Sequence, residues 1–264
     1  MIKANPVRSE RSSSTTMPEI IIRPCESHDD FRQCVRLQQA VWRFSDLDTV
    51  PVHIFVVAQH TGGLVLGAFA PGDRMIGFAS AFLARHQESL CFHSDMLAVL
   101  PEYQNRGVGR RLKLFQREVA LQRGYNLIVW TFDPLQAANA HFNINRLGAV
   151  ARQYKVNCYG SDVSSHLHRG LDTDRLLAEW WLTSDRVREH LVGARWERGS
   201  PVATVEIPAN INELKTRDSG VAREWQLRVR EQFSRYFAQG FYVGGFERAS
   251  DGAIFRYLLF PQEP

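Results

Sequence analysis

The chain has 264 residues, of which 44% are hydrophobic, and it carries a formal net charge of +4. This length suffices for one or two domains with a core that needs no disulfide or metal to stabilise it. The four widely spaced cysteines exclude a disulfide scaffold and indicate the reduced thiols of a cytoplasmic protein. No stretch reads as a membrane helix, and no apolar signal-peptide segment is seen in residues 1–17. What remains to be explained is a basic pI of about 9.0, which indicates an anionic partner.

The N-terminal part of the chain predicts a polar tail, a short strand and two helices. The tail is rich in Ser and Thr and poor in apolar residues, so it is expected to be disordered. Ser27 and the acidic residues after it form an N-cap signal, and apolar residues then recur at helical spacing. The expected ranges are 1–17 for the tail, 20–24 for the strand, and 27–42 and 51–59 for the helices.

Three strand-like segments come next. They are separated by short connections, the first of which is the turn Pro71-Gly72-Asp73. Short connections between consecutive strands are typical of an antiparallel meander. The expected strands cover residues 64–70, 75–84 and 89–99.

The middle of the chain alternates helices and strands. A helix is predicted from Gly107 to Arg123, because apolar residues recur on one side of it and basic residues on the other. The apolar run 126–132 is typical of a strand that is buried on both faces. A helix over 137–147 and a strand over 149–157 follow, so the expected fold is a mixed α/β sheet with helices.

After about residue 160 the character of the chain changes. A polar loop is expected over 161–170, and no internal repeat of 20–50 residues is seen. The predicted elements are strands at 175–182, 202–207, 241–246 and 254–260 and a long amphipathic helix at 219–239. We therefore divide the chain into the tail 1–17, a core domain over about 18–160 and a C-terminal α/β extension over 161–264.

The segment Met96–Arg111 carries the clearest chemistry. A strand ends, a loop with a proline follows, and the run 104–109 (QNRGVG) opens the helix. Gly107 and Gly109 let the backbone come close to a bulky anion. The free N–H groups of a first helical turn, with the helix dipole behind them, form a site for a pyrophosphate. The span from Arg106 to Arg123 has six basic residues and one acidic residue, a net +5 that exceeds the charge of the whole chain.

Other phosphate motifs fit this segment less well. A Walker A loop requires a Gly-Lys-Ser/Thr ending, and a dinucleotide fingerprint requires three glycines, whereas only Gly107 and Gly109 are present. A basic, solvated helix after a glycine turn is the alternative without a ligand. The histidines and cysteines show no metal-ligand spacing, so no metal is expected. Nucleic-acid binding would rest on the pI alone, because the charge is concentrated on one helix.

The segment resembles the signature of the GNAT superfamily of acyl-CoA N-acyltransferases. The residues that carry the resemblance are the strand Met96–Val99, then Pro101-Glu102-Tyr103, then Gln104–Gly109. The strand 127–132 and the Leu147-Gly148-Ala149 ending are similar to the next block of that family. The resemblance covers about residues 19–157, and it implies a GNAT-like core in which the strand 96–99 diverges from the strand 127–132.

The resemblance implies that acetyl-CoA or another acyl-CoA lies in this gap as co-substrate. Its pantetheine arm would pair with the strand, and strand N–H groups would hold the thioester carbonyl as an oxyanion hole. The pyrophosphate would lie on the backbone at the start of the helix. The residues expected to bind the cofactor are Leu97, Ala98, Val99, Gln104, Asn105, Arg106, Gly107, Val108, Gly109, Arg110 and Asn139.

Direct attack of an amine on the thioester requires a base, because a primary amine is mostly protonated at neutral pH. His93 and Asp95 are the candidates, since residues two apart on a strand share a face. The family often has a Tyr as the acid for the leaving thiolate, but the matching position here is Ile144. Tyr154 or a water molecule is the substitute that we consider, and the thiolate leaving without an acid is the other alternative.

The sequence therefore predicts an acyl-CoA-dependent N-acyltransferase. The acceptor is expected to be a primary amine of a small molecule or an amino acid, and acetyl is the expected acyl group, with succinyl-CoA as a larger alternative donor. A module that binds or senses CoA without turnover is the second hypothesis, supported by Ile144. No nucleic-acid or membrane partner is expected. The extension is expected to complete the substrate cleft or to form a homodimer face.

Overall fold

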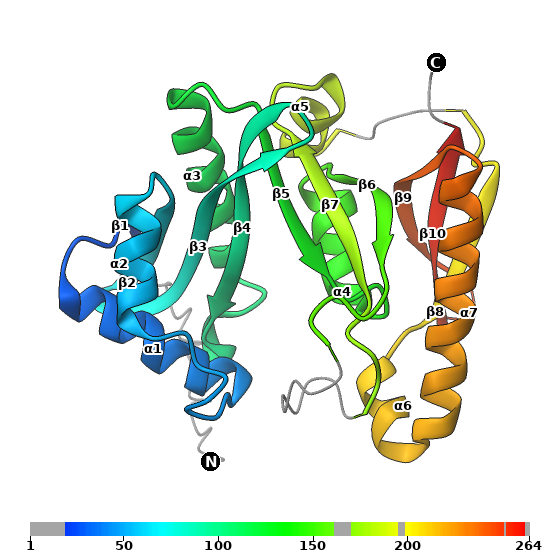
Figure 1. Ribbon diagram of the computed structural model, residues 1–264, viewed down its shortest axis with the longest axis horizontal. Coiled ribbons are helices and arrows are strands. Elements are labelled where there is room, and N and C mark those ends of the chain that lie inside the picture. Colours follow the sequence, from blue (N-terminus) through cyan, green and yellow to red (C-terminus); the bar gives the residue numbers. More distant parts are fainter. Residues whose placement is uncertain (1–18, 161–169, 195–198, 251, 262–264) are drawn as a thin grey trace, which may run out of the picture.

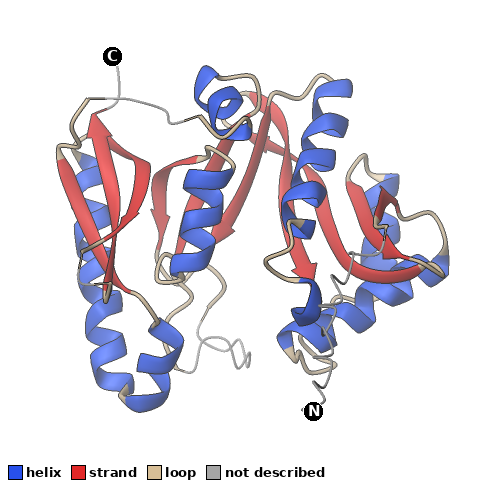
Figure 2. Ribbon diagram, turned by 180° about the vertical axis from the view of Figure 1, so that it is seen from behind, coloured by secondary structure: helices blue, strands red, loops and turns tan. Residues whose placement is uncertain are grey.

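The structure is a computed structural model that describes residues 19–160, 170–194, 199–250 and 252–261. The expected tail and most of the expected loop at 161–170 lie outside these residues. The described residues form a ten-stranded mixed sheet in the order β1-β2-β3-β4-β5-β7-β6-β9-β10-β8. Figure 1 shows α1, α2 and α7 on one face of the sheet, and Figure 2 shows α3 and α4 on the other. The predicted mixed α/β fold is confirmed.

The elements follow the sequence pattern closely. The strands are β1 (Ile21–Pro24), β2 (Leu64–Ala70), β3 (Arg74–His86), β4 (Ser89–Val99), β5 (Leu127–Phe132), β6 (Val150–Lys155), β7 (Arg175–Trp181), β8 (Ala203–Pro208), β9 (Phe241–Arg248) and β10 (Ile254–Pro261). The helices are α1 (His28–Trp42), α2 (Val52–His60), η1 (Pro101–Tyr103), α3 (Val108–Gln122), α4 (Ala137–Ala140), η2 (His141–Arg146), α5 (Asp185–Leu191), α6 (Ile211–Arg217) and α7 (Ser219–Ala238). The sequence patterns missed α5 and α6, which are too short to show a helical period.

Helix α1 begins where its capping residues predict. The Ser27 side chain accepts a hydrogen bond from the Asp30 N–H, and the Asp30 carboxylate accepts one from the Ser27 N–H. This reciprocal capping box satisfies two N–H groups that the helix itself cannot. Arg23 of β1 donates two hydrogen bonds to the same carboxylate, so the cap also joins the helix to the edge of the sheet.

The Arg23–Asp30 pair should make part of the stability dependent on acid. Burial alone would raise the pKa of Asp30, but Arg23 and the N–H groups of Glu26 and Ser27 outweigh it and lower the pKa to about 2. Because the folded pKa is below the unfolded one, the contribution is present above about pH 4 and is lost as the pH falls toward 2. We expect Asp30→Asn to lower the free energy of unfolding at pH 7 by about 1–2 kcal/mol, since Arg23 is partly exposed. Urea unfolding at pH 7 and pH 3 checks this, and a difference that does not shrink at pH 3 would contradict it.

Strands β2, β3 and β4 form the predicted antiparallel meander. The β3–β4 pairing shifts register, with Ala81 opposite Ser94 and Ser80 opposite Met96. Asp95 is therefore the extra residue of a β-bulge in β4, a feature that often re-aims side chains next to functional sites. The bulge lies just beyond the point at which β4 and β5 separate.

The C-terminal region continues the sheet rather than forming a separate one. Strand β7 lies between β5 and β6, so the expected boundary at residue 160 falls between two paired strands, β6 and β7. Beyond β7, the order of strands β8, β9 and β10 repeats that of β5, β6 and β7, because in both groups the third strand lies between the first two. Helix α7 packs on β8 and β9 and also reaches β6, which holds the last three strands against the core.

Candidate active site

The two central strands part along most of their length. β4 and β5 are parallel but pair only at Phe92–Ile128 and His93–Val129. Beyond these pairs lies a cavity of about 490 Å³ between the diverging strands. The side chains that line it come from the end of α1 and the segment after it, from β4, α3, β5, the segment after β5, α4 and η2, and from three later segments of the chain. They are Trp42, Phe44, His93, Ser94, Asp95, Met96, Leu97, Lys113, Trp130, Thr131, Phe132, Asp133, Gln136, Asn139, Phe142, Asn143, Tyr159, Arg175 and Asn212.

The open edge of β4 offers hydrogen-bond donors to this cavity. The Leu100 N–H bonds to the Ile76 carbonyl on the β3 side. Because successive N–H groups of a strand point in opposite directions, those of Val99 and Leu97 face the separated edge. Ala98 and Val99 are buried, with side chains in the core. This part of β4 therefore offers its backbone to a ligand.

His93 and Asp95 both line the cavity. Burial lowers the pKa of His93, and the positive charges of Lys155 and Lys113 lower it further, so the imidazole is neutral at pH 7 and can accept a proton. Asp95 is exposed at the mouth of the cavity, where the surrounding protein still displaces enough water to raise the pKa of its carboxyl group. The structure thus brings the two expected bases together.

The loop before α3 has the backbone geometry of an anion site. Asn105 (φ 57°) and Gly107 (φ 81°) adopt left-handed conformations, and Gly107 is the N-cap of α3. A side chain added at Gly107 would point into open space. Glycine is therefore favoured here by the positive φ angle and not by a lack of space. The Gln104 side chain donates to the Val99 carbonyl and ties this loop to the end of β4. Residues 105–109 thus present the free N–H groups of the helix to solvent.

The basic residues of α3 do not form one solvated patch. Arg110, Arg111, Arg117 and Arg123 donate hydrogen bonds to backbone carbonyls of other elements. Lys113, one of the six basic residues counted over 106–123, does not belong to this surface charge, because it is 2% exposed and faces the cavity. The positive charge near the start of α3 is therefore that of Arg106, Arg110 and Arg111, and the last two are anchored to the Leu191 and Ile20 carbonyls.

Lys113 is the least expected group of the site. Its ammonium donates to the Ser94 hydroxyl at 3.1 Å and to the Gln116 amide oxygen at 2.6 Å. It also lies 4.1 Å from the centre of the Trp130 ring, a cation–π contact. Burial lowers the pKa of Lys113 to about 7. An amine that changes its charge near neutral pH thus lies where β4 and β5 diverge.

The later part of the chain supplies one wall of the cavity. Asn212 of α6 and Gln136 exchange two hydrogen bonds between their side-chain amides, each of 3.1 Å. The Tyr159 hydroxyl lies 2.6 Å from that of Thr131, and the Arg175 guanidinium lies over the Tyr159 ring. The extension therefore reaches the cavity through α6 and supports it through β7.

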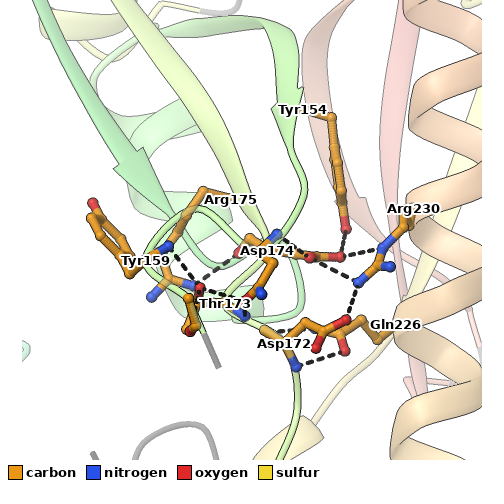
Figure 3. A network of polar contacts seen from close by, with 10 residues as sticks. Tyr154, Tyr159, Asp172, Thr173, Asp174, Arg175, Gln226 and Arg230 are labelled. Carbon is orange, nitrogen blue, oxygen red and sulfur yellow. Dashed lines mark hydrogen bonds and ion pairs between the residues drawn. The ribbon is translucent and has the colours of Figure 1, made fainter. Parts of the chain in front are cut away.

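A network of polar contacts holds this wall in place (Figure 3). The Asp174 carboxylate is buried, accepts hydrogen bonds from the Tyr154 hydroxyl and the Asn157 N–H, and forms an ion pair with Arg230 of α7. Gln226, one turn earlier on α7, exchanges hydrogen bonds with the backbone of Asp172. The network thus fixes the start of β7, where Arg175 follows Asp174.

Two expected catalytic positions lie away from the cavity. The Tyr154 hydroxyl points to Asp174 rather than into the cavity, and burial together with that carboxylate raises its pKa well above the usual range. Ile144 is fully buried in the core. The expected acid is therefore not supplied at either position by the described geometry. Asn139 is exposed and lines the cavity.

Several cavity residues escaped the sequence analysis, and only some left a signal. Lys113 and Gln116 lie on the buried face of α3 with Val108, Leu112 and Ala120, so helical spacing marks that face but does not show that a lysine on it is buried. Arg175 and Tyr159 leave no comparable signal, because the segment between them has no period. Among the described residues, no group of three or more His, Cys, Asp or Glu side chains could hold a metal, and no helix has the length and apolar character to cross a membrane.

The sheet with two diverging central strands, the β4 bulge and the free N–H groups at a helix start together form a site with room for an extended anionic molecule. Residues 24–148 match the sequence model of the acetyltransferase (GNAT) family. This part of the chain is a GNAT acetyltransferase domain, which confirms the resemblance.

Solved structures share the fold at low identity. The ribosomal-protein-S18-alanine N-acetyltransferase from Escherichia coli is 19% identical, with a TM-score of 0.50, and the match covers 63% of this chain and 96% of that one. A putative GNAT acetyltransferase from Desulfovibrio desulfuricans is 16% identical, with a TM-score of 0.51 and coverage of 62% and 100%. The NatC complex bound to Gag peptide and CoA is 15% identical, with a TM-score of 0.50 and coverage of 62% and 99%. Among curated protein sequences, none matches this chain.

Proposed function

We propose that this protein transfers an acyl group, most simply acetyl, from an acyl-CoA to a primary amine of a small molecule or amino acid. The observation that carries the proposal is the cavity of about 490 Å³ between β4 and β5, with two candidate bases on its wall. From this cavity β4 leads on to the loop that begins α3 at Gly107. The family of residues 24–148 supports acyl transfer from acyl-CoA.

The donor would extend from the start of α3 to the β4 bulge. The N–H groups of residues 105–109 and the positive charges of Arg106 and Arg110 fit the pyrophosphate. The pantetheine arm would add to the open edge of β4 as a further strand, using the N–H groups of Leu97 and Val99. The same N–H groups would stabilise the oxyanion that forms on the thioester carbonyl. The residues fit acetyl-CoA and succinyl-CoA alike.

The acceptor would enter from the side of Asp95 and His93. A neutral His93 takes the proton of the incoming ammonium, and Asp95 at the mouth attracts that ammonium by its charge. The nitrogen then attacks the thioester carbon, and the C–S bond breaks. We propose that the acyltransferase core continues through β7, because this strand completes the sheet around the cavity. We also propose that residues 203–261 support the wall formed by Gln136, Tyr159, Arg175 and Asn212, which we call the acceptor wall.

Isothermal titration of the full-length protein with acetyl-CoA, succinyl-CoA and free CoA tests the donor. We expect a dissociation constant in the micromolar range for at least one of them, and the absence of binding at tens of micromolar would overturn the proposal. A thiol-release assay over a panel of amines and amino acids then tests transfer. Binding without release on any amine would instead support a module that senses CoA.

A further inference from the structure

The reaction proposed above ends with a thiolate, and the described geometry assigns no obvious acid to it. Ile144 is in the core, and the Tyr154 hydroxyl is committed to Asp174. Of the titratable groups that line the cavity and that the transfer step does not use, the amine of Lys113 is the buried one. We propose that Lys113, acting through the Ser94 hydroxyl that accepts its hydrogen bond, donates the proton to the leaving CoA thiolate.

The position of Lys113 carries this inference. It extends from α3 to the base of the gap between β4 and β5, and its side chain and that of Ser94 both line the cavity. Ser94 directly precedes the bulge residue Asp95, so the hydroxyl lies beside the open edge of β4 on which the thioester arm would lie. Both residues are buried, which keeps competing water away from the proton path.

The surroundings of Lys113 suit a proton donor better than a structural ion pair. Its recorded polar partners are the neutral Ser94 hydroxyl and Gln116 amide, and the Trp130 and Trp180 rings flank it at 4.1 and 5.5 Å. A purely structural buried lysine is normally paired with a carboxylate, because an unpaired buried charge is costly. Here burial lowers the pKa to about 7, below the value of about 8.5 for an ordinary thiol, so the ammonium can give its proton to a thiolate.

Other titratable groups face the same space and must be separated from Lys113 in any pH experiment. They are His93 and Asp95 on β4, Asp133 after β5, and Tyr159 and Arg175 on the wall from the later part of the chain; β5 itself has no titratable residue. On α3, Arg110 and Arg117 are bonded to carbonyls outside the cavity. On β7, Glu179 is paired with Arg152.

The step balances without any further reactant. As the C–S bond breaks, the sulfur keeps the electron pair and takes the proton of the Ser94 hydroxyl, while that oxygen takes a proton from Lys113. Lys113 is left neutral. His93 passes the first proton of the incoming ammonium to solvent and then takes the second, which the nitrogen releases as the amide forms, and this second proton recharges Lys113. The sum is acyl-CoA plus ammonium giving amide, CoA thiol and one proton released to solvent.

The inference rests on the proposed function, so the test separates the two. Isothermal titration first establishes that wild type and Lys113→Met bind acetyl-CoA. We expect dissociation constants within about threefold of each other, since the phosphate site is untouched. With the amine that the release assay identifies, we expect Lys113→Met to lower kcat at least 100-fold, the usual scale of acid–base catalysis. The wild-type kcat should fall as the pH rises through about 7, and the variant should lose this limb.

Matched variants distinguish proton donation from packing or charge. Lys113→Arg keeps the positive charge but does not release a proton, so it should not restore kcat. Ser94→Ala should cause a similar loss, and the double variant should lose little more than either single one. Arg117→Met, which removes a charge from the next turn of the same helix, should keep kcat within threefold. An unchanged kcat and pH profile in Lys113→Met, with acetyl-CoA still bound, would overturn the inference but leave the proposed function intact.

A second measurement works even where no amine is turned over. Bromoacetyl-CoA places an alkylating carbon at the position of the acyl group, and a neutral amine displaces its bromide. At pH 8 we expect mass spectrometry to find one covalent adduct, on Lys113, that Lys113→Met lacks. Bound reagent that labels His93 alone, or labels neither residue, would place the acyl group away from Lys113 and refute the assignment. Failure of acetyl-CoA to bind at all would instead refute the proposed function.

Discussion

Replacing Gly107 by Glu should weaken acetyl-CoA binding at least 100-fold, which corresponds to about 2.7 kcal/mol. Gly107 is the N-cap of α3, and a side chain at this position would extend from the turn into the open space in front of the helix. A carboxylate there would occupy the N–H groups that the pyrophosphate requires and would repel its charge. Isothermal titration of the variant with acetyl-CoA measures the effect.

The same helix offers a matched control. Gly124 follows the other end of α3, has φ 79° against 81° at Gly107, and also faces open space. Gly124→Glu therefore imposes a similar backbone strain without touching the phosphate site, and its binding constant should stay within threefold of wild type. Gly107→Gln should lie between the two, since it adds bulk without charge. If Gly107→Glu binds acetyl-CoA like wild type while both proteins stay folded, the pyrophosphate lies elsewhere.

The start of α3 could be predicted from sequence because its determinants are local. Gly107 and Gly124 both adopt the left-handed backbone that glycine favours, and they bracket a helix whose apolar spacing is regular. The same holds for the Ser27 cap and for the buried strand β5, where the local sequence pattern is enough to predict the element. Local propensity and the tertiary fold agree at these positions.

Lys113 shows where local reasoning fails. On the sequence it belongs to a run of basic residues, and a lysine on a helix is ordinarily solvated. Its burial is decided by Trp130 and Trp180, which come from two strands that only the fold places beneath α3. The basic residues expected to form one charged cluster therefore make separate contacts, each with a segment that is distant in the sequence.

The acceptor wall could not be predicted for a related reason. Asp174, which directly precedes β7, and Arg230 of α7 are 56 positions apart, and the predicted boundary at residue 160 leaves both inside the extension. Their pairing depends on the insertion of β7 into the sheet between β5 and β6. The spacing of apolar residues in the sequence does not predict this non-local arrangement. The strand itself was predicted at the correct residues, but its place in the sheet was not.

Of the contacts that support the acceptor wall, the Asp174–Arg230 pair should lower the free energy of unfolding most when it is broken. Asp174 is 1% exposed, and Arg230 meets it with two hydrogen bonds of 2.8 and 2.9 Å. Arg230→Met would leave a buried carboxylate without its counter-charge, which typically costs about 3–5 kcal/mol. We expect the free energy of unfolding in urea to fall by about 3 kcal/mol, and KM for the acceptor to rise because Arg175 loses its fixed neighbour.

Removing the Asp174 charge as well tests whether the unpaired carboxylate causes this loss of stability. In Arg230→Met combined with Asp174→Asn, no buried charge remains, so the double variant should recover about half of the lost stability. Arg228→Met lies on the exposed side of the same helix, where its recorded contact is with the Trp225 ring, and should change stability by less than about 0.5 kcal/mol. A double variant less stable than Arg230→Met alone would show that Asp174 is held by Tyr154 and the backbone rather than by Arg230. In that case α7 would be a support for the sheet only, and the acceptor wall would be fixed from within the core.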